Sequence, residues 1–398
     1  MKKAMILGMI IAFLSFTSIG FANTWWNTNW QYRRNITIDN TGNSDTLNNY
    51  QIAINITYDS DMQSDFDDIR FVDDTTELNY WLQEKVDSEW AYFWVKIPSV
   101  PALDTKDIYI YYGNSSVSSK SNGDNTFLFF DDFLGNILNT TKWYMTAGSI
   151  TVNNSIVTID TGGTGDGSIR ASYPLQPYYW FEIKSRMVHK YTSFTAVAIG
   201  ERVTLSIDDR VYTYRYEADD QEKHFYIDGS KMYEAPFAFT HGNWYRLSLN
   251  RTGTNSITGC IDNADCNTQS SPLSGNVSLS TWQGRAQYDW IFVRNHSLPE
   301  PTYSIGSEES LPPIPPCNCT ELTERISVLE EEVEDLQSRV ETLEQGQGTF
   351  PPHNHTISEV IGLQSILDSI QNTIRLVICE LLPKGLLQAA KFDTSYCQ

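Results

Sequence analysis

Short segments in which polar and apolar residues alternate are the feature that most constrains the fold of this chain. Between residues 32 and 113 they read YRRNITID, YQIAINITY, DIRFVD, LNYWLQEKV, AYFWVKIPSV and KDIYIYYG, separated by polar or Pro-containing breaks. Alternation with a period of two is typical of half-buried β-strands, and no amphipathic helical pattern lies between these segments. We therefore predict an antiparallel β-sandwich over residues 23–127.

The order of motifs in this first domain resembles a known family. WWNTNWQYRRNITIDN, LNNYQIAINI, DFDDIRFVDDTTELNYWL, AYFWVKIPSVPA and IYIYYGNSS follow one another as they do in domain of unknown function 2341. That family is found in exported archaeal and bacterial proteins. The resemblance implies a compact β domain and export, and it implies no known chemistry.

A second β domain is expected over residues 128–308. Its candidate strands include SIVTID, YYWFEIKSRM, TAVAIG, RVYTYRYE, KHFYIDG, WYRLSLN and SITGCID. The closing segment AQYDWIFVRNHSLPEPTYSIG resembles the end of concanavalin-like or laminin-G-like sandwiches. This resemblance implies a jelly-roll sandwich of a kind that often binds glycans, but it transfers no residue-level sugar site because such domains share architecture with little sequence.

The first 22 residues predict export. Lys2 and Lys3 precede an apolar run over residues 4–16, and Gly20 and Ala22 are the small residues of a signal-peptide cleavage site. No later segment is apolar and long enough to cross a bilayer, so we expect a mature chain without a transmembrane anchor. The expected location is the extracellular space, a cell surface or a virion surface. A net charge of −21 argues against nucleic acid as a partner.

A helical stalk is predicted after the β domains. The Pro- and Cys-containing linker at 309–319 leads to a heptad repeat over 320–346, and a second apolar stripe lies within a helical segment expected at 347–398. The heptad positions are Leu322, Ile326, Leu329, Val333, Leu336, Val340 and Leu343, followed by Leu363, Leu367, Ile370, Ile374 and Val377. The predicted fold class is thus mainly β, with two tandem antiparallel β-sandwich domains and an α-helical coiled-coil stalk. A single amphipathic helix packed on a domain is the alternative.

The stalk predicts a homo-oligomer. β-branched residues at the a positions with Leu at d favour two strands in the first stripe, whereas the second stripe favours three or more. The segment HNHTISEVIGLQSILDSIQ resembles the tips of bacteriophage tail fibres, which implies a trimer. We therefore expect a homotrimer in preference to a dimer.

Six cysteines in an exported chain predict disulfides. Cys260 and Cys266 flank a short loop and are expected to pair within the chain. Cys317 and Cys319 are too close in sequence to pair easily with each other and suit bonds between chains. The pairing of Cys379 and Cys397 stays open.

Two metal sites are possible from the sequence. His353 and His355 would present six imidazoles in a trimer, an arrangement that suits a transition metal and that the tail-fibre resemblance implies. Exposed histidines in a turn are the alternative. Asp160 and Asp166 in DTGGTGDGS offer ligands for calcium in a β-sandwich loop, although a plain hairpin is the simpler interpretation.

One acidic array suggests catalysis. Glu217, Asp219 and Glu222 have the spacing of the carboxylates in some glycoside hydrolases of concanavalin-like fold. RVYTYRYEADDQEKHFYIDG, however, reads as strand, acidic turn and strand, which would leave the carboxylates solvated. Ala, Asp and Gln stand between the acids, where those hydrolases normally carry apolar residues. No Ser/His/Asp arrangement or phosphate-binding loop is present, so we predict that the chain is not an enzyme.

The predicted function is that of a secreted, oligomeric surface adhesin or a spike or fibre subunit that recognises cell-surface glycans or glycoproteins through its β domains. The residues of the sugar site are not predicted, because aromatic clusters such as Trp25, Trp26 and Trp30 more often pack in cores. A structural subunit of a surface layer or filament is one alternative. A secreted glycoside hydrolase of concanavalin-like fold is the other.

Overall fold

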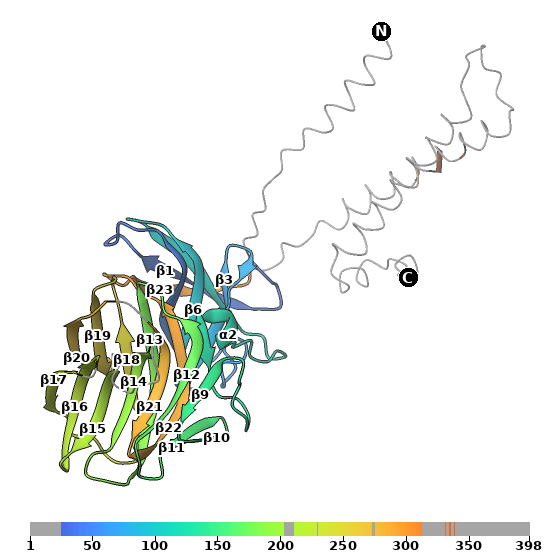
Figure 1. Cartoon of the computed structure of the whole chain (residues 1–398). Helices are drawn as coiled ribbons and strands as arrows, with labels where there is room; N and C mark the ends of the chain where they lie inside the picture. Colours follow the sequence, from blue (N-terminus) through green and yellow to red (C-terminus); the bar gives the residue numbers. More distant parts are fainter. Residues whose placement is uncertain are drawn as a thin grey trace, which may run out of the picture. The chain divides into compact units, whose positions relative to one another are not determined.

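The computed structural model describes residues 25–312, apart from 203–210, 229 and 273–274, together with positions 331, 334, 335 and 338. The chain divides into two compact units, residues 1–311 and 312–398. The described part of the first unit is almost entirely antiparallel β-sheet, so the prediction of a mainly β, sandwich-like fold is confirmed (Figure 1). Among the described residues, no helix has the length and apolar character needed to cross a membrane.

The first β-sandwich packs a five-stranded sheet, in the order β23-β1-β7-β3-β4, against a three-stranded sheet, β2-β6-β5. Its strands are β1 (Tyr32–Asp39), β2 (Leu47–Thr57), β3 (Arg70–Asp73), β4 (Thr76–Glu77), β5 (Tyr80–Val86), β6 (Trp90–Val100), β7 (Thr105–Tyr112) and β23 (Thr302–Ser310). Alternate residues of these strands, among them Ile36, Ile54, Phe93 and Ile108, are fully buried between the two sheets. The period of two in the sequence therefore marks the side chains of this core.

The second β-sandwich packs an eight-stranded sheet against a seven-stranded sheet, β17-β16-β15-β14-β21-β12-β9. The eight-stranded sheet has the order β10-β11-β22-β13-β18-β19-β20, with β8 also paired to β22. The strands are β8 (Phe129–Asp131), β9 (Trp143–Ala147), β10 (Ser149–Asn153), β11 (Ile156–Asp160), β12 (Asp166–Pro174), β13 (Tyr179–Lys190), β14 (Ala196–Arg202), β15 (Val211–Glu217), β16 (Asp220–Ile227), β17 (Ser230–Pro236), β18 (Tyr245–Asn250), β19 (Ser256–Ile261), β20 (Asp265–Ser270), β21 (Asn276–Trp282) and β22 (Gly284–Asn295). The short helix α2 (Gly123–Thr126) precedes β8.

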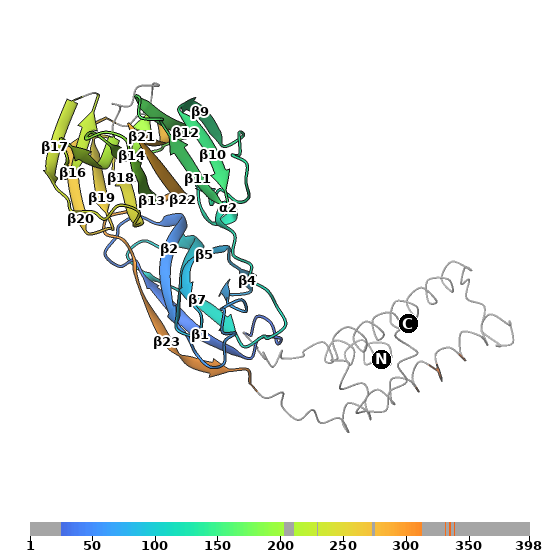
Figure 2. The same ribbon diagram turned by 90° about the horizontal axis from the view of Figure 1, so that it is seen from below.

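Strand β23 returns from the end of the second sandwich to the first. It pairs antiparallel with β1, with Tyr32 opposite Ser310 and Asp39 opposite Thr302. Figure 2 shows β23 leaving the second sandwich and running beside β1. The boundary expected at residue 308 therefore falls inside a strand of the first sandwich, and the second sandwich is inserted between α2 and β23. Local sequence could not show this, because a strand at a sheet edge carries no signal for a partner so distant in the chain.

An aromatic cluster joins the two sandwiches. Its buried members are Trp81 and Trp94 from the first sandwich, Phe127 from the connection, Phe130 from β8, and Trp290 and Phe292 from β22. The rings of Phe127 and Phe292 stack with centroids 4.4 Å apart. The guanidinium of Arg294 lies 5.0 Å from the ring centroid of Trp94 and 4.9 Å from that of Trp180. Six buried aromatic side chains thus join the two sandwiches, which belong to one compact unit.

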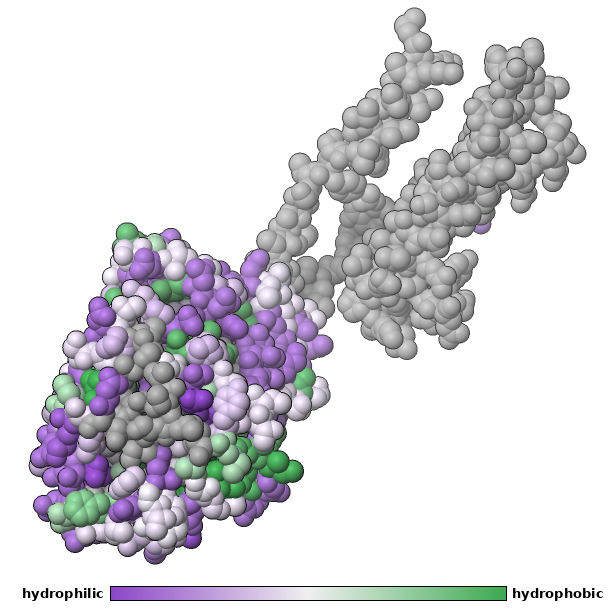
Figure 3. Space-filling model, viewed as in Figure 1, coloured by the Kyte–Doolittle hydropathy of each residue, from purple (hydrophilic) through white to green (hydrophobic). Residues whose placement is uncertain are grey.

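The surface of this unit is mostly polar on the face shown in Figure 3, with one compact hydrophobic patch. Among the described residues, the most exposed large hydrophobic side chains are Ile137 (84%) and Leu134 (80%), in the loop between β8 and β9. Polar surface of this kind agrees with the net charge of −21.

The stalk predictions fall outside the described residues. These include all the heptad positions, Cys317, Cys319, His353, His355, Cys379 and Cys397, as well as the signal peptide over 1–22. Positions 331, 334, 335 and 338 are helical. The coiled coil, its trimeric state and export therefore stay predictions.

Candidate functional site

The outer face of the seven-stranded sheet carries polar side chains that do not pack in the hydrophobic core. Paired residues of neighbouring antiparallel strands point to the same face of a sheet. One row across the sheet points into the core and consists of Ile169, Leu279, Ile199, Tyr212 and Phe225. The next row points away from the core and consists of Ser168, Ser280, Ala198, Thr213 and His224. The outer row is nonetheless buried. It forms a floor of small side chains that ends at His224.

Charged residues gather at that end of the sheet, on β15, β16 and β17. The group, called here the His224 cluster, consists of Arg215, Glu217, Glu222, His224, Tyr226, Lys231 and Glu234. Its members on β16 are spaced at every second residue, so all of them face outward.

A tight hairpin brings the carboxylates of the His224 cluster together. Ala218 and Asp219 both have positive φ, 50° and 73°, and form the two-residue turn between β15 and β16. The pairing places Arg215 opposite Glu222. The interpretation of EADDQE as strand, turn and strand is thereby confirmed. Ligand atoms of Glu217, Glu222 and His224 all lie within 4.8 Å of one another.

His224 is fully buried and fixes the position of Glu222. Its Nε2 lies 2.6 Å from Oε2 of Glu222, and its Nδ1 lies 3.1 Å from the hydroxyl of Tyr226. Arg215 donates to the same hydroxyl at 2.9 Å. Burial lowers the pKa of His224, against the opposing effect of the hydrogen bond to Glu222. A neutral His224 donates from Nε2 to the carboxylate and accepts from Tyr226 at Nδ1, so the partners fix its tautomer.

Glu217 has a different environment. Its carboxylate lies 3.3 Å from Nε of Arg215 and 3.8 Å from Nζ of Lys231, and its side chain is 31% exposed. Lys231 also pairs with Glu234, whose carboxylate raises the pKa of that amine. Both cations of the cluster, Arg215 and Lys231, thus contact its carboxylates, and with His224 neutral the cluster keeps a net negative charge.

Two groups among the described residues contain three potential metal ligands. One is the Glu217, Glu222 and His224 set. A metal ion there would have to displace the cations that already contact Glu217, so we assign none. The other consists of Asp59, Asp61 and Glu308 in the first sandwich. Arg34 contacts two of these carboxylates, at 2.5 Å and 3.8 Å, and accounts for their position without an ion.

Asp160 and Asp166, the residues considered for calcium, belong to neither group. Asp160 accepts from Arg285 at 2.7 Å and from the hydroxyl of Tyr191 at 3.0 Å. Burial opposes ionisation of Asp160, but these hydrogen bonds and that from the Gly162 amide lower its pKa overall. The side chain thus has a structural role at the end of β11.

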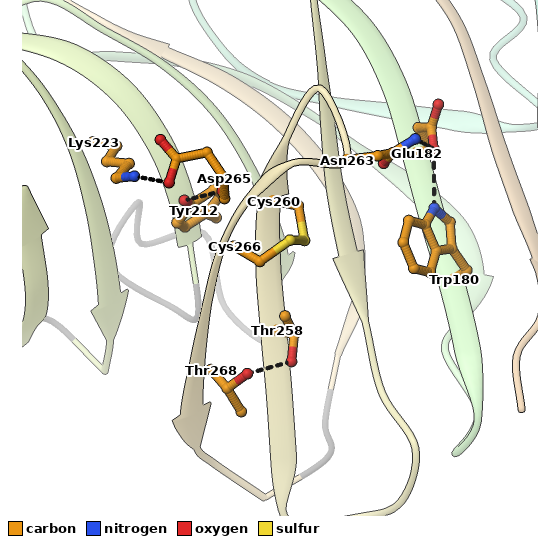
Figure 4. The surroundings of a disulfide bond; sticks show 10 residues. All are labelled: Trp180, Glu182, Tyr212, Lys223, Thr258, Cys260, Asn263, Asp265, Cys266 and Thr268. Carbon is orange, nitrogen blue, oxygen red and sulfur yellow. Dashed lines mark hydrogen bonds and ion pairs between the residues drawn. A yellow bond between two sulfur atoms is a disulfide. The ribbon is translucent and has the colours of Figure 1, made fainter. Parts of the chain in front are cut away.

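The predicted Cys260–Cys266 disulfide is present. It crosses the β19–β20 hairpin, where the two cysteines are directly paired (Figure 4). The hydroxyls of Thr258 and Thr268 lie 2.8 Å apart on the same hairpin, and Asp265 pairs with Lys223 of β16 (Figure 4). The disulfide therefore fastens a hairpin that contacts the other sheet of the sandwich.

The aromatic clusters considered for sugar stacking are mostly packed. Trp25 and Trp30 are 7% and 6% exposed and pack with Tyr111. The hydroxyl of the buried Tyr179 donates to Glu201. The roles of Arg215, His224 and Tyr226 were not predicted. These polar residues stand at every second position of β15 and β16, a pattern that predicts side chains on the face away from the core. That pattern could have placed them beside the acids of the turn.

Comparison with known proteins supports the family resemblance of the first domain. Residues 65–146 match the family described as Domain of unknown function (DUF2341). The uncharacterized protein MJ1472 of Methanocaldococcus jannaschii is 24% identical over 241 residues, which cover 55% of this chain and 43% of that protein. This chain thus spans less than half the length of that relative. These matches give no support to the resemblance to phage tail fibres.

Solved structures resemble the β-sandwich fold. The carbohydrate binding module CBM66 from Bacillus subtilis matches with a TM-score of 0.34 and 12% identity, covering 39% of this chain and 96% of that one. The β-glucanase of Bacillus licheniformis matches with a TM-score of 0.33 and 14% identity, covering 42% and 97%. At such similarity the matches transfer no residue of a site.

The prediction that the chain is not an enzyme is contradicted by this comparison, because β-glucanases are among the similar structures. The prediction rested on the placement of the acidic array at a solvated turn. The turn is present, but Glu222 is 19% and Glu217 is 31% exposed and both lie beside the fully buried His224, so the side chains are not simply solvated.

Proposed function

We propose that this chain recognises glycans through the outer face of the seven-stranded sheet, at the His224 cluster. The observation that carries the proposal is the buried His224, which holds Glu222 at 2.6 Å beside the partly exposed Glu217. The chemistry fits a sugar because each hydroxyl of a glycan both donates and accepts hydrogen bonds. Carboxylates, a guanidinium and an ammonium offer fixed acceptors and donors on one surface.

Glycan-array binding by the full-length chain tests this proposal, with the affinity for the strongest glycan then measured by calorimetry. Glu222→Gln keeps the shape of the side chain and removes its charge. We expect a rise in Kd of about tenfold or more, since hydrogen bonds to charged groups contribute about 1.5–3 kcal/mol.

The matched control is Asp289→Asn, a carboxylate on the other sheet that pairs with Lys184 at 3.1 Å. It is expected to bind as the wild type does. An array without any bound glycan, or equal affinities for wild type and Glu222→Gln, would refute the proposal.

Glycoside hydrolysis is a second candidate, favoured by one observation. Ligand atoms of Glu217 and Glu222 lie within 4.8 Å of each other, near the separation of about 5–5.5 Å between the carboxyl groups of retaining glycosidases. Incubation of the full-length chain with β-glucan, followed by detection of reducing ends, tests it. Hydrolysis that disappears in both Glu217→Gln and Glu222→Gln would support it, and binding without product release would leave recognition alone.

The adhesin proposal adds export and a trimeric stalk to the recognition site. Trimerisation through the heptads would multiply weak contacts of single sites into useful avidity. Light scattering on residues 23–398, with and without reductant, is the test. Three times the chain mass in both conditions is expected. A monomer in both would refute the stalk and leave the glycan site unaffected.

A further inference from the structure

A polar cleft opens at one edge of the first sandwich, far in the sequence from the His224 cluster. Its volume is about 490 Å³, within the range of about 300–1,000 Å³ found for ligand pockets. It is lined by Glu77, Leu78, Asn79, Lys120, Ser121, Asn122 and Asn125. The cleft lies where the chain crosses from β4, the edge of one sheet, to β5, the edge of the other. All of its lining residues fall within the segment that matches the family of unknown function.

The wall formed by residues 118–122 is held in place from behind by buried side chains. The hydroxyl of Tyr80, 1% exposed, accepts from the Lys120 amide at 3.0 Å and donates to the Ile69 carbonyl at 3.1 Å. Arg70, also 1% exposed, donates to the Ser118 carbonyl at 2.8 Å. A wall fixed in this way needs little reordering when a ligand binds.

The opposite wall and the helix are fixed as well. The Lys96 side chain donates to the Asn125 carbonyl, and the Lys96 amide donates to the Asn79 carbonyl at 2.9 Å. The side chain of Asn122 caps α2 by accepting from the Asn125 amide at 2.9 Å. These contacts use the backbones of Asn79 and Asn125. Within the described residues, the side-chain amides of both asparagines form no hydrogen bond.

The lining decides the chemical class of ligand. Lys120 and Glu77 pair at 2.8 Å, so the cleft favours neither an anion nor a cation. An apolar ligand would cover the amides of Asn79 and Asn125 without bonding them, which is costly. A carboxamide offers both donors and an acceptor, as the hydroxyls of a sugar do.

A peptide added as a further β-strand is disfavoured, because the edge of β5 is occupied. The Asn122 amide donates to the Tyr80 carbonyl at 2.8 Å, and the Leu82 amide donates to the Ser121 hydroxyl at 2.8 Å. Strand addition requires free backbone groups of this kind. We propose that the cleft between β4, β5 and α2 is a second glycan site, one that binds a neutral saccharide through the carboxamides of Asn79 and Asn125. This inference extends the proposed glycan recognition to the first sandwich.

The test uses the full-length chain on an array of neutral oligosaccharides, followed by calorimetry with each bound glycan. The variant is Asn79→Ala combined with Asn125→Ala. Since these side chains make no hydrogen bonds to any residue that the structure describes, the variant should keep the wild-type melting temperature. Asn153→Ala, an exposed asparagine on β10, is the matched control.

For at least one glycan, we expect the double variant to raise Kd about tenfold or more, as the loss of two neutral hydrogen bonds implies. Glu222→Gln should leave the affinity for that glycan unchanged. If every bound glycan depends on Glu222 and none on the two asparagines, this inference is overturned and the proposed function stands. Binding to a peptide array in place of glycans, lost in the double variant, would overturn the saccharide assignment. If the wild type binds no glycan, both proposals fail.

Discussion

The two sandwiches differ in how the chain builds them, although both are antiparallel and pack similar cores. The second runs without interruption from β8 to β22. The first is completed only when β23 returns to β1 after the second has been made. The first sandwich is therefore one body in space although it is built from two separate segments of the chain. A chain that ends at residue 127 lacks β23, and a boundary at residue 308 falls within β23, so neither gives a complete first sandwich.

The polar pairs of the two sandwiches differ in the same way. In the first sandwich, polar pairs fasten the returning strand: Arg33 donates to Glu309 at 2.8 Å, and the hydroxyl of Tyr112 donates to Glu308 at 2.6 Å. In the second, the Glu201–Arg251 pair lies in the core with both side chains 0% exposed. The contacts of Glu308 and Glu309 hold β23 against the first sandwich. The Glu201–Arg251 pair instead joins segments within the contiguous second sandwich.

Removal of β23 should therefore have the largest effect. A chain ending after Pro301 leaves Arg33 and Tyr112 without their carboxylates and β1 without its neighbour. We expect the first sandwich to lose cooperative unfolding while the second retains it. Hydrogen exchange, which reports each sandwich separately, is the measurement.

A chain ending at Pro312 keeps β23 and is the control for that truncation. It should protect the amides of both sandwiches. Equal protection of the β1 and β7 amides in the two truncated chains would show that the first sandwich folds without β23. The first sandwich would then be as self-contained as the second.

Glu201→Gln should produce the next largest effect, confined to the second sandwich. It leaves Arg251 charged and buried without its partner, for which the expected loss is about 3–5 kcal/mol in the free energy of unfolding. Urea denaturation measures this loss. The double variant Glu201→Met, Arg251→Met removes both charges and should cost less. If the double variant is the less stable of the two, the pair contributes net stability beyond its mutual compensation.

Much of this fold could be predicted from the sequence, because the alternation that buries a strand is local. The segment YRRNITID coincides with β1, and the hairpin between Tyr216 and Gln221 was recognised from its turn residues. Strands such as β17 and β20, in which no residue is fully buried, escaped prediction because they lack the alternation of buried apolar and exposed polar residues.

The candidate sites show where prediction ended. The carboxylates of the His224 cluster were noticed as a string, but their convergence on His224 depends on register between strands. The polar cleft escaped notice because its two walls, at residues 77–79 and 120–125, are brought together by tertiary contacts of Tyr80, Arg70 and the Lys120–Glu77 pair. Contacts between segments so far apart follow from topology and not from composition.

Acid should weaken the junction between the sandwiches through Glu300. Burial alone would raise the pKa of this carboxyl, but Arg294, at 2.9 Å, and hydrogen bonds from His296 and Tyr50 lower it to about 2. The folded pKa lies below the unfolded value of 4.5. The contribution to stability is therefore complete above pH 4.5 and is lost as the pH falls towards 2. The effect should be smaller than that of Glu201→Gln because the Glu300 side chain is 35% exposed.

Denaturation across pH 2 to 5 measures this dependence, with Glu300→Gln as the comparison. That variant should lack the part of the pH dependence that Glu300 supplies. Identical slopes for the wild type and the variant would show that the junction does not depend on this carboxylate.

Replacement of both Cys260 and Cys266 by Ser should have the smallest effect of the four. The bridge closes a loop with a sequence separation of only 6 residues. A loop this short restricts the unfolded chain little, and the expected loss is roughly 2 kcal/mol in the free energy of unfolding. Urea denaturation under oxidising conditions measures it, and reductant should lower the stability of the wild type to that of the double variant. A loss as large as that of Glu201→Gln would mean that the β19–β20 hairpin needs the bridge to stay against Lys223 of the facing sheet. The second sandwich would then depend, as the first does, on a fastening at its edge.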